Sequence, residues 1–588
     1  MTFSQLIGRF IWRHRRRYLA AATMLVMVAA LSVWIPRKVG QLVDVLVAGQ
    51  LHPDRVHGLN LSYIYHELGV LLCMGLAIYF LRVGWRMQLF TASYQLGVQL
   101  RTALYQRLCL QGPAFFQQQR TGDLMALGTN DADAVELAAG DAMLAGFDGS
   151  LTLVMVLAML FLGIDWRVTV VALLPFPFMA FAFKRITRQV HNASHDALDR
   201  FSQLNDQVQE SIAGIRTVRA LGLEQRNARI FSDLAEQAAA ASLRAQRWEA
   251  AYEPTVGLAL TTAGVLALAM GGYRVWHGQM SVGALASFVM YLGQLIWPMF
   301  AAGWVLALIE RGRAAWRRLE PVLSLPLSID DGGVVDATPS GIIQFKNVWL
   351  AYAGQLQPAL QGVSMTLPVG ATIGVVGPTG SGKSTLLRLL LRQYQADAGD
   401  VAWGEHRLCD YRLETLRSHI SWVAQEPFLF SATIAENIAL GKPDATATEI
   451  AHAAELAAIH EDIVQFPLGY HTLVGERGVT LSGGQRQRVA IARALLTTMP
   501  LLLLDDALSA VDTGTQARIL QHLRATRSGR TVVVVSHRLS AVADADHIVV
   551  LRQGKVIEQG THAALLRFDG WYASQWRYQQ LEASLDGL

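Results

Sequence analysis

The chain has 588 residues, of which 52% are hydrophobic and only 16% are charged. Soluble domains carry about 25% charged residues, so this composition excludes a disordered or ordinary soluble chain and indicates a membrane protein with further domains. The formal charge of +4 gives no reason to expect nucleic acid as a partner, and the three cysteines form no CxxC or Cys/His cluster that suggests zinc.

Residues 1–17 predict a short helix in the membrane interface, followed by a basic flank. Apolar residues between Phe3 and Ile11 recur at helical spacing, and Arg13 begins a run of basic residues that ends at Arg17. The apolar stretch 18–36 comes next. It is longer than the apolar core of a signal peptide and has no small-residue cleavage site, so it indicates a retained membrane span.

Five more stretches approach the roughly 20 residues that cross a bilayer: 63–84, 142–163, 167–184, 255–276 and 282–308. We therefore expect six spanning helices within residues 18–310. The long connections 85–141 and 185–253 are rich in arginine and have helical periodicity. Basic residues near spans stay in the cytoplasm, so both long connections and both termini are expected there.

A different pattern begins after the last span. Residues 311–341 contain prolines and an Asp-Asp-Gly-Gly run, which predicts a linker. Beyond it, the β-type runs 342–345, 372–376, 501–504 and 531–535 alternate with helical stretches. This alternation predicts an α/β domain with a largely parallel sheet.

The strongest local signal is a phosphate-binding loop between strand 372–376 and a helical run. It consists of Gly377, Pro378, Thr379, Gly380, Ser381, Gly382, Lys383, Ser384 and Thr385. Glycines let backbone N–H groups turn toward phosphates, and the helix N-terminus favours anions. Lys383 is expected to reach the β- and γ-phosphates, and the Ser384 hydroxyl to ligate Mg²⁺.

A second strand, 501–504, ends at Asp505. Alone, it would be compatible with any core strand that ends in a surface carboxylate. Beside a phosphate loop in a parallel sheet, it predicts a second Mg²⁺-facing group.

Three further features point to a family: the pentapeptide LSGGQ, the glutamine after strand 420–423, and the histidine that follows strand 531–535. They comprise Leu481, Ser482, Gly483, Gly484, Gln485, Gln425 and His537. With the two nucleotide motifs, they make residues 342–575 resemble the ATP-binding cassette of ABC transporters. The resemblance implies a head-to-tail cassette dimer that binds two ATP molecules, each between one chain's loop 377–385 and the other chain's residues 481–485.

The same resemblance assigns roles to single residues. Gln425 would contact Mg²⁺ and sense the membrane domain, and His537 would act as the switch histidine. Tyr352 matches the aromatic residue that stacks on adenine, with a role as a core tyrosine left open. Residues 509–512 match the D-loop.

The membrane half resembles ABC exporters. Residues 115–131 and 214–220 are similar to their first and second intracellular loops, and Gly475–Gly478 to the cassette segment that contacts those loops. The resemblance implies a half-transporter of a bacterial inner membrane. Its fold would be a six-helix all-α membrane domain with long cytosolic helical extensions, followed by an α/β cassette and a C-terminal helix or tail at 576–588. No substrate-binding protein is implied.

Asp506 departs from the family pattern, because hydrolytic sites place a glutamate directly after the Asp505 position. An aspartate stops about 1.5 Å short, and a misplacement of about 1 Å can cost about 100-fold in rate. The chain resembles the first subunit of bacterial heterodimeric multidrug-resistance-like exporters, in which the partner's site hydrolyses most of the ATP. A homodimer with slow turnover is the alternative.

The cargo is expected to be an amphiphilic small molecule. Near the cytoplasmic edge of the third span, Asp141 and Asp148 could attract cations, although a solvated helix extension explains them better. In the sixth span, Trp297, Met299 and Phe300 could line an apolar cavity, and lipid-facing or packing roles explain them at least as well. Two rival functions are a lipid or lipid-precursor flippase and a non-transporting ATP-gated regulator.

Overall fold

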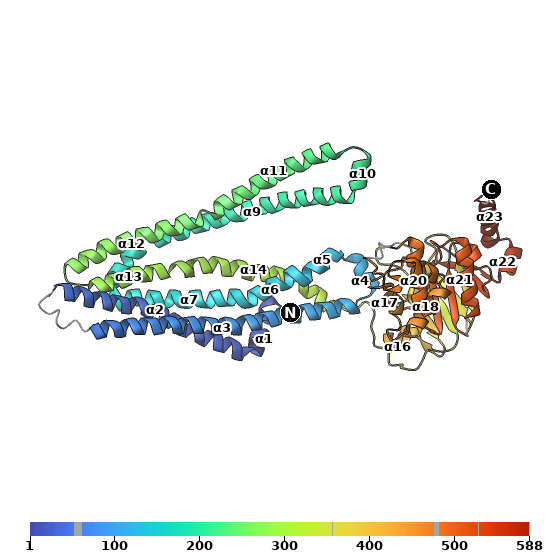
Figure 1. The fold of residues 1–588 in the computed structure, drawn as a ribbon, viewed down its shortest axis with the longest axis horizontal. Coiled ribbons are helices and arrows are strands. Elements are labelled where there is room, and N and C mark those ends of the chain that lie inside the picture. Colours follow the sequence, from blue (N-terminus) through green and yellow to red (C-terminus); the bar gives the residue numbers. More distant parts are fainter. Residues whose placement is uncertain (52–60, 356, 476–480, 527–528, 587–588) are drawn as a thin grey trace. The chain divides into compact units, whose positions relative to one another are not determined.

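The computed structural model describes residues 1–51, 61–355, 357–475, 481–526 and 529–586. The chain forms two compact units. One comprises Met1–Arg107 and Gly122–Ser324, and the other Leu108–Thr121 and Leu325–Leu588. Figure 1 shows that the first consists of helices and the second of a sheet-containing domain with helices around it. We call them the membrane unit and the cassette unit.

The membrane unit begins with α1 (Phe3–Arg13), where a short helix was expected. Thr2 and Gln5 form a capping box at its N-terminus, and Ile7 and Phe10 are buried on one face. The remaining helices include π-helical turns, which are labelled η. They are α2 (Arg15–Leu51), α3 (Leu61–Leu110), α5 (Thr121–Ala126), η2 (Leu127–Asp131), α6 (Ala132–Leu137), η3 (Ala138–Ala142), α7 (Met143–Ala158), η4 (Met159–Asp165), α8 (Trp166–Leu173), α9 (Pro175–Ala213), α10 (Ile215–Ala220), α11 (Glu224–Glu249), α12 (Tyr252–Trp276), α13 (Val282–Gln294) and α14 (Ile296–Ser324).

The long connection predicted at 185–253 is helical, as its periodicity indicates. Helices α9 and α11 pack side by side, and the short helix α10 joins them at one end (Figure 1). Residues 214–220, which were expected to form the second intracellular loop, therefore lie at the tip of a helical arm.

Within the described residues, five helical stretches are long and apolar enough to cross a membrane: Arg15–Ala48, Ser62–Leu110, Thr121–Leu173, Glu224–Trp276 and Val282–Ser324. The expected count of six is not confirmed. The predicted fourth span, 167–184, is shared between α8 and α9, which are separated at Leu174. The interruption precedes Pro175, whose ring nitrogen carries no hydrogen to donate to the preceding turn.

Helices α2 and α13 approach each other closely enough for their backbones to touch. A Cβ atom added to Gly283 would lie 1.9 Å from the carbonyl oxygen of Gly40, so only glycine fits at this crossing. The Tyr291 hydroxyl donates to the carbonyl of Val33 at 2.6 Å, and the Ser287 hydroxyl donates to the carbonyl of Pro36 at 2.8 Å. Small residues and interhelical hydrogen bonds of this kind stabilise helix pairs in lipid.

The expected linker at 311–341 is wrong in its first part, because α14 continues to Ser324. Gly312, Ala315, Trp316 and Leu319 are buried along one face of this helix. This spacing of three and four residues extends the apolar stripe past the last span, and packing along it outweighs the helix-breaking tendency of Pro321.

The cassette unit contains two sheets. The first has the strand order β2-β1-β4-β5 and is antiparallel, and the second has the order β10-β9-β3-β8-β7-β6 with parallel pairs from β9 to β6. The strands are β1 (Ile343–Leu350), β2 (Leu360–Leu367), β3 (Thr372–Val376), β4 (Ala398–Trp403), β5 (His406–Arg407), β6 (Ile420–Val423), β7 (Leu501–Asp505), β8 (Thr531–Val535), β9 (His547–Arg552) and β10 (Lys555–Gly560). The predicted parallel sheet is therefore present. Its neighbouring strands β7 and β8 are buried along their whole length.

Helices complete the cassette unit. They are α4 (Pro113–Gln118), α15 (Lys383–Leu390), α16 (Leu413–Arg417), α17 (Ile434–Ala439), α18 (Ala447–Leu456), α19 (His460–Gln465), α20 (Gly483–Leu495), α21 (Thr513–Ala525), α22 (His562–Phe568) and α23 (Trp571–Asp586). Helix α4, from the predicted first intracellular loop, belongs to this unit, where the Gly112 N–H donates to the Ser328 hydroxyl at 2.9 Å.

The expected C-terminal tail at 576–588 starts inside a helix, since α23 begins at Trp571. Glu558 of β10 fixes the start of this helix, because its carboxylate accepts the N–H groups of Trp571 at 2.6 Å and Tyr572 at 3.2 Å. Tyr572 is fully buried in the cassette core. The last helix is thus an integral part of the cassette.

Candidate functional site

The phosphate loop joins β3 to α15, as its sequence predicts. Gly377 has φ 148° and Gly382 has φ 100°, a backbone region that side chains rarely tolerate. A Cβ at Gly377 would also lie 2.0 Å from the carbonyl oxygen of Leu551. The Lys383 ammonium donates to the carbonyls of Gly377 and Pro378, at 2.9 Å each, so the lysine lies across its own loop.

A cavity of about 720 Å³ opens beside this loop. It brings together most of the predicted nucleotide residues from β3–α15, β7 and the segments after β6 and β8. Its predicted lining residues are Tyr352, Thr379, Gly380, Ser381, Gly382, Lys383, Ser384, Thr385, Gln425, Asp505, Asp506 and His537. Gly377, Pro378 and the pentapeptide 481–485 are not in its lining.

Burial sets the electrostatics of the cavity floor. The Ser384 hydroxyl donates to the Asp505 carboxylate at 2.8 Å. Burial raises the pKa of Asp505, while this hydrogen bond acts in the opposite direction. Burial likewise lowers the pKa of Lys383, although the charges of Asp506 and Asp505 oppose the shift. Both pKa shifts have burial of a charged group as their main cause. A bound phosphate or cation would offset the free-energy cost of burying these charges.

Asp506 has an unusual backbone. It adopts φ 47°, a left-handed conformation that aspartate tolerates better than most residues. Its N–H donates to the carbonyl of Val535 at 2.9 Å, and its carboxylate accepts from His537 Nδ1 at 2.9 Å. Asp506 and His537, two of the three residues predicted to act in hydrolysis with Gln425, are therefore in direct contact.

The site suits a nucleotide phosphate chain. The Ser381 hydroxyl is buried in the loop without a hydrogen-bond partner among the described residues, as a group that awaits a phosphate oxygen would be. Among those same residues, no three His, Cys, Asp or Glu side chains cluster to hold a metal by themselves. Mg²⁺ usually keeps waters and binds through one or two carboxylates plus phosphates, so Ser384 and Asp505 are an adequate donor set.

The pentapeptide 481–485 forms the N-terminus of α20. Ser482 and Gln485 make a capping box, in which the Ser482 hydroxyl accepts the Gln485 N–H at 3.2 Å. The Gln485 side chain also donates to Asp462 of α19 at 3.1 Å, and Arg488 donates to the same carboxylate at 2.7 Å. This geometry leaves Ser482 and Gly483 exposed at the start of the helix.

Comparisons with known proteins agree with this arrangement. Two family descriptions match: "ABC transporter transmembrane region" over residues 18–299 and "ABC transporter" over residues 360–509. The chain is 42% identical over 585 residues to the multidrug resistance-like ATP-binding protein MdlA of Escherichia coli (strain K12), a match that covers 99% of this chain and 98% of that protein. This chain belongs to the ABC exporter family.

Two further relatives place the exporter within the family. The chain is 32% identical over 483 residues to an ATP-dependent lipid A-core flippase of Photobacterium profundum, a match that covers 82% of each chain. A solved structure titled "Structure of a bacterial Atm1-family ABC exporter with ATP bound" is similar at a TM-score of 0.77 and 28% identity. It covers 96% of this chain and 99% of that chain. The exporter is thus a multi-pass membrane protein whose cassette binds and hydrolyses ATP.

The structure adds residues that the sequence motifs did not indicate. Gln579 of α23 donates to the carbonyl of His537 at 2.9 Å and accepts the N–H of Leu539 at 2.9 Å. It therefore holds the loop that contains His537 from the far end of the chain. Tyr352 donates to or accepts from the Thr385 hydroxyl at 3.0 Å, and Arg388 donates to the Tyr352 hydroxyl at 3.3 Å. A lone glutamine or arginine in a helix carries no sequence signal for such roles.

The predicted segment Gly475–Gly478 lies outside the described residues except for its first glycine. It therefore stays a prediction from resemblance.

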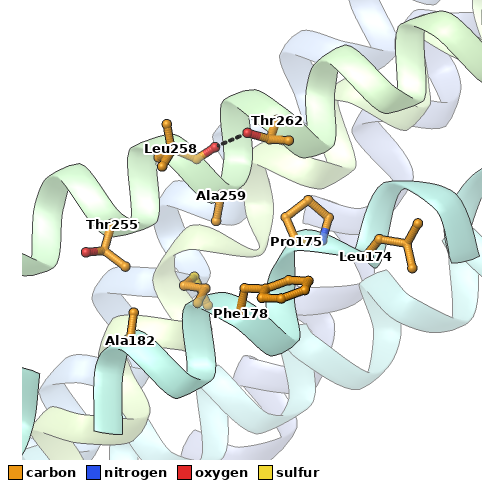
Figure 2. Close-up of a pocket in the computed structure, with 9 residues that line it drawn as sticks. Leu174, Pro175, Phe178, Ala182, Thr255, Leu258, Ala259 and Thr262 are labelled. Atoms are coloured by element: carbon orange, nitrogen blue, oxygen red, sulfur yellow. Dashed lines mark hydrogen bonds between the residues drawn. The ribbon is translucent and has the colours of Figure 1, made fainter. Parts of the chain in front are cut away.

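The membrane unit contains a separate apolar hollow of about 430 Å³ between α9 and α12. Figure 2 labels eight of its lining residues: Leu174, Pro175, Phe178, Ala182, Thr255, Leu258, Ala259 and Thr262. Met179 also lines the hollow. The expected cargo residues do not line it. Among them, Met299 packs against residues of α9 and α12.

Proposed function

We propose that this exporter is one half of a heterodimer that moves amphiphilic small molecules out of the cell. In this proposal, ATP bound at the chain's own loop is hydrolysed slowly, and the partner's site performs most of the hydrolysis. The observation that carries the proposal is the short carboxylate of Asp506, held by His537 at 2.9 Å on one side of the nucleotide cavity.

A water that attacks the γ-phosphate must be positioned and polarised in line with the leaving group, and small displacements are costly. The Asp506 carboxylate keeps the charge required for this role but has a shorter reach than glutamate. The chain's own site therefore retains the groups that bind nucleotide, but its Asp506 carboxylate would lie farther from the attacking water than a glutamate carboxylate would.

The signature segment of this chain has the opposite character. Its capping box is intact, and Gln485 and Arg488 both donate to the Asp462 carboxylate. Helix N-termini with free N–H groups bind phosphates, so this segment is suited to complete a nucleotide site on a second subunit. The proposed heterodimer would therefore contain one site that hydrolyses ATP rapidly and one that hydrolyses it slowly.

We also propose six membrane crossings, with both termini in the cytosol of a bacterial inner membrane. Asp165 is extended, with φ −157° and ψ 118°, between η4 and α8, and α8 packs against both η4 and α12. Asp165 pairs with Arg274 of α12 at 2.8 Å. These features support a chain reversal near Asp165, which ends the third crossing and begins a fourth that continues through α8 into α9.

The decisive experiment compares ATP hydrolysis in two preparations. The chain purified alone is expected to bind Mg·ATP and hydrolyse it weakly. Coexpression with a second cassette chain that carries glutamate after its Walker B aspartate is expected to restore turnover and ATP-dependent uptake of an amphiphilic dye into inverted vesicles. Brisk hydrolysis by the chain alone would refute the heterodimer and favour a homodimer.

A lipid or lipid-precursor flippase is the second candidate, and the similarity to a lipid A-core flippase favours it. Stimulation of ATP hydrolysis separates the two functions: amphiphilic drugs should stimulate an exporter of small molecules, and a lipid should stimulate a flippase. An ATP-gated regulator would show neither uphill transport in vesicles nor substrate-stimulated turnover.

A further inference from the structure

A second large hollow lies in the membrane unit, where α1, α2, α3, α7 and α14 meet. Its volume is about 760 Å³, within the range of sites that hold small molecules. Its lining includes Trp12, Arg15, Leu25, Phe147, Ser150 and Ile309. It shares no lining residue with the nucleotide cavity or with the hollow between α9 and α12.

The lining combines an apolar interior with one cation at its edge. Arg15 is the only charged residue in the lining, and it lies within the basic run of residues 13–17. Its guanidinium lies 5.2 Å from the ring centre of Trp12, which is 72% exposed. No carboxylate pairs with Arg15 among the residues that the structure describes. The cation is therefore available to an anion from outside the protein.

The place of these groups in the sequence, directly before an apolar span, predicts that they lie at the depth of lipid headgroups. Tryptophan and arginine at the end of an apolar span lie at the membrane–water interface. Basic pockets between membrane helices at this level bind anionic lipid headgroups, and apolar grooves below them accept acyl chains. An acyl chain fits the apolar part of the lining, and a phosphate fits Arg15.

We propose that this hollow is a binding site for a glycerophospholipid with an anionic headgroup. One acyl chain occupies the space between α2, α7 and α14, and the headgroup phosphate pairs with Arg15. The Trp316 indole of α14 donates to the carbonyl of Met1 at 2.8 Å, which already ties the segment before α1 to α14. A bound lipid would add contacts between the same elements and stabilise their packing. The site is independent of cargo and of the heterodimer proposal.

The test measures binding of matched lipids to the delipidated full-length chain in mild detergent, without nucleotide. Phosphatidylglycerol and phosphatidylcholine with the same acyl chains are titrated by native mass spectrometry and thermal shift. Phosphatidylglycerol is expected to bind more tightly and raise the melting temperature more. Arg15→Gln should weaken phosphatidylglycerol about fivefold, which corresponds to about 1 kcal/mol for one basic residue near the surface, and leave phosphatidylcholine unchanged.

Two matched controls make the result specific. Arg16→Gln removes the same charge from the same basic run but does not line the hollow, so it should have little effect. Ser150→Trp fills the hollow and should weaken both lipids, whereas Ala158→Trp, on an exposed part of α7 outside the lining, should weaken neither. Glycerol phosphate, a headgroup without chains, should not bind.

Equal affinity for the two lipids would overturn the proposal. Equal losses in Arg15→Gln and Arg16→Gln would overturn it as well, because they would indicate attraction to the whole basic run. Unchanged binding in Ser150→Trp would show that lipids do not enter the hollow.

Discussion

Replacing Asp506 with glutamate tests whether the reach of this side chain limits hydrolysis at the chain's own site. The Cα position is fixed, since the Asp506 N–H donates to Val535 at 2.9 Å and the strands on either side are buried. An added methylene therefore moves the carboxylate forward by about 1.5 Å, the length of one carbon–carbon bond. The carboxylate would then lie nearer to a water in line with the γ-phosphate.

The expected gain follows from two opposing contributions. Removing a misplacement of about 1 Å is worth up to about 100-fold, or about 2.7 kcal/mol in the activation free energy. Against this, the hydrogen bond between His537 and the carboxylate must rearrange, at a cost of about 1 kcal/mol. The difference of about 1.7 kcal/mol predicts that Asp506→Glu increases the rate by about tenfold to twentyfold.

The assay is ATP turnover by the assembled transporter whose partner carries glutamine in place of its catalytic glutamate, so that only this chain's site contributes. Asp506→Asn, which keeps the size and removes the charge, is the control and should fall below the wild type. Nucleotide affinity should be similar in all three proteins. If Asp506→Glu bound ATP normally and turned over no faster than the wild type, side-chain reach would not be the limiting factor.

Three other changes test the cassette's supporting contacts. Gln579→Ala removes both hydrogen bonds to the loop that contains His537 and should lower turnover by about threefold to tenfold with ATP affinity unchanged, whereas the exposed neighbour in Gln580→Ala should behave as wild type. Burial acts to raise the pKa of Asp462, but the hydrogen bonds from Arg488 and Gln485 outweigh burial and lower this pKa. The ionised Asp462 carboxylate therefore stabilises the fold above the ordinary pKa of 3.8, and this stabilisation is lost as the pH falls through the lowered pKa. The melting-temperature difference between wild type and Asp462→Asn should accordingly be constant from neutral pH to near 3.8 and shrink only below it. Glu558→Ala leaves two N–H groups of α23 without an acceptor and should destabilise the cassette by about 1.5–3 kcal/mol in denaturant unfolding.

The nucleotide site could be predicted from the sequence because its chemistry is local. A strand, a glycine-rich turn and a helix start are encoded in one stretch, and the structure places β3 and α15 on either side of the loop as expected. Strand 531–535 was predicted residue for residue, since five consecutive apolar or β-branched residues suit a strand buried on both faces. Asp505 is the last residue of β7 and His537 lies two residues after β8 in the same parallel sheet, so their convergence on one cavity also follows from topology.

Other features depend on contacts that no local pattern encodes. The end of α14 at Ser324 is set by packing of its buried face, which overrides the prolines that suggested a linker. The fourth span was identified by hydropathy, but hydropathy does not reveal that the helix is interrupted at Leu174. Gln579 lies 42 residues after His537 along the chain, so its role depends on α23 folding back against the loop that contains His537.

The contact between α2 and α13 limits where the exporter can bend during its transport cycle. Two helices joined backbone to backbone at Gly40 and Gly283 cannot slide past one another without separating first. Rearrangement must then take place at other helix–helix contacts of the bundle, while α2 and α13 move together as a rigid pair. Nitroxide labels at the exposed positions Met27 and Val289 are therefore expected to report one unchanging distance distribution with and without nucleotide.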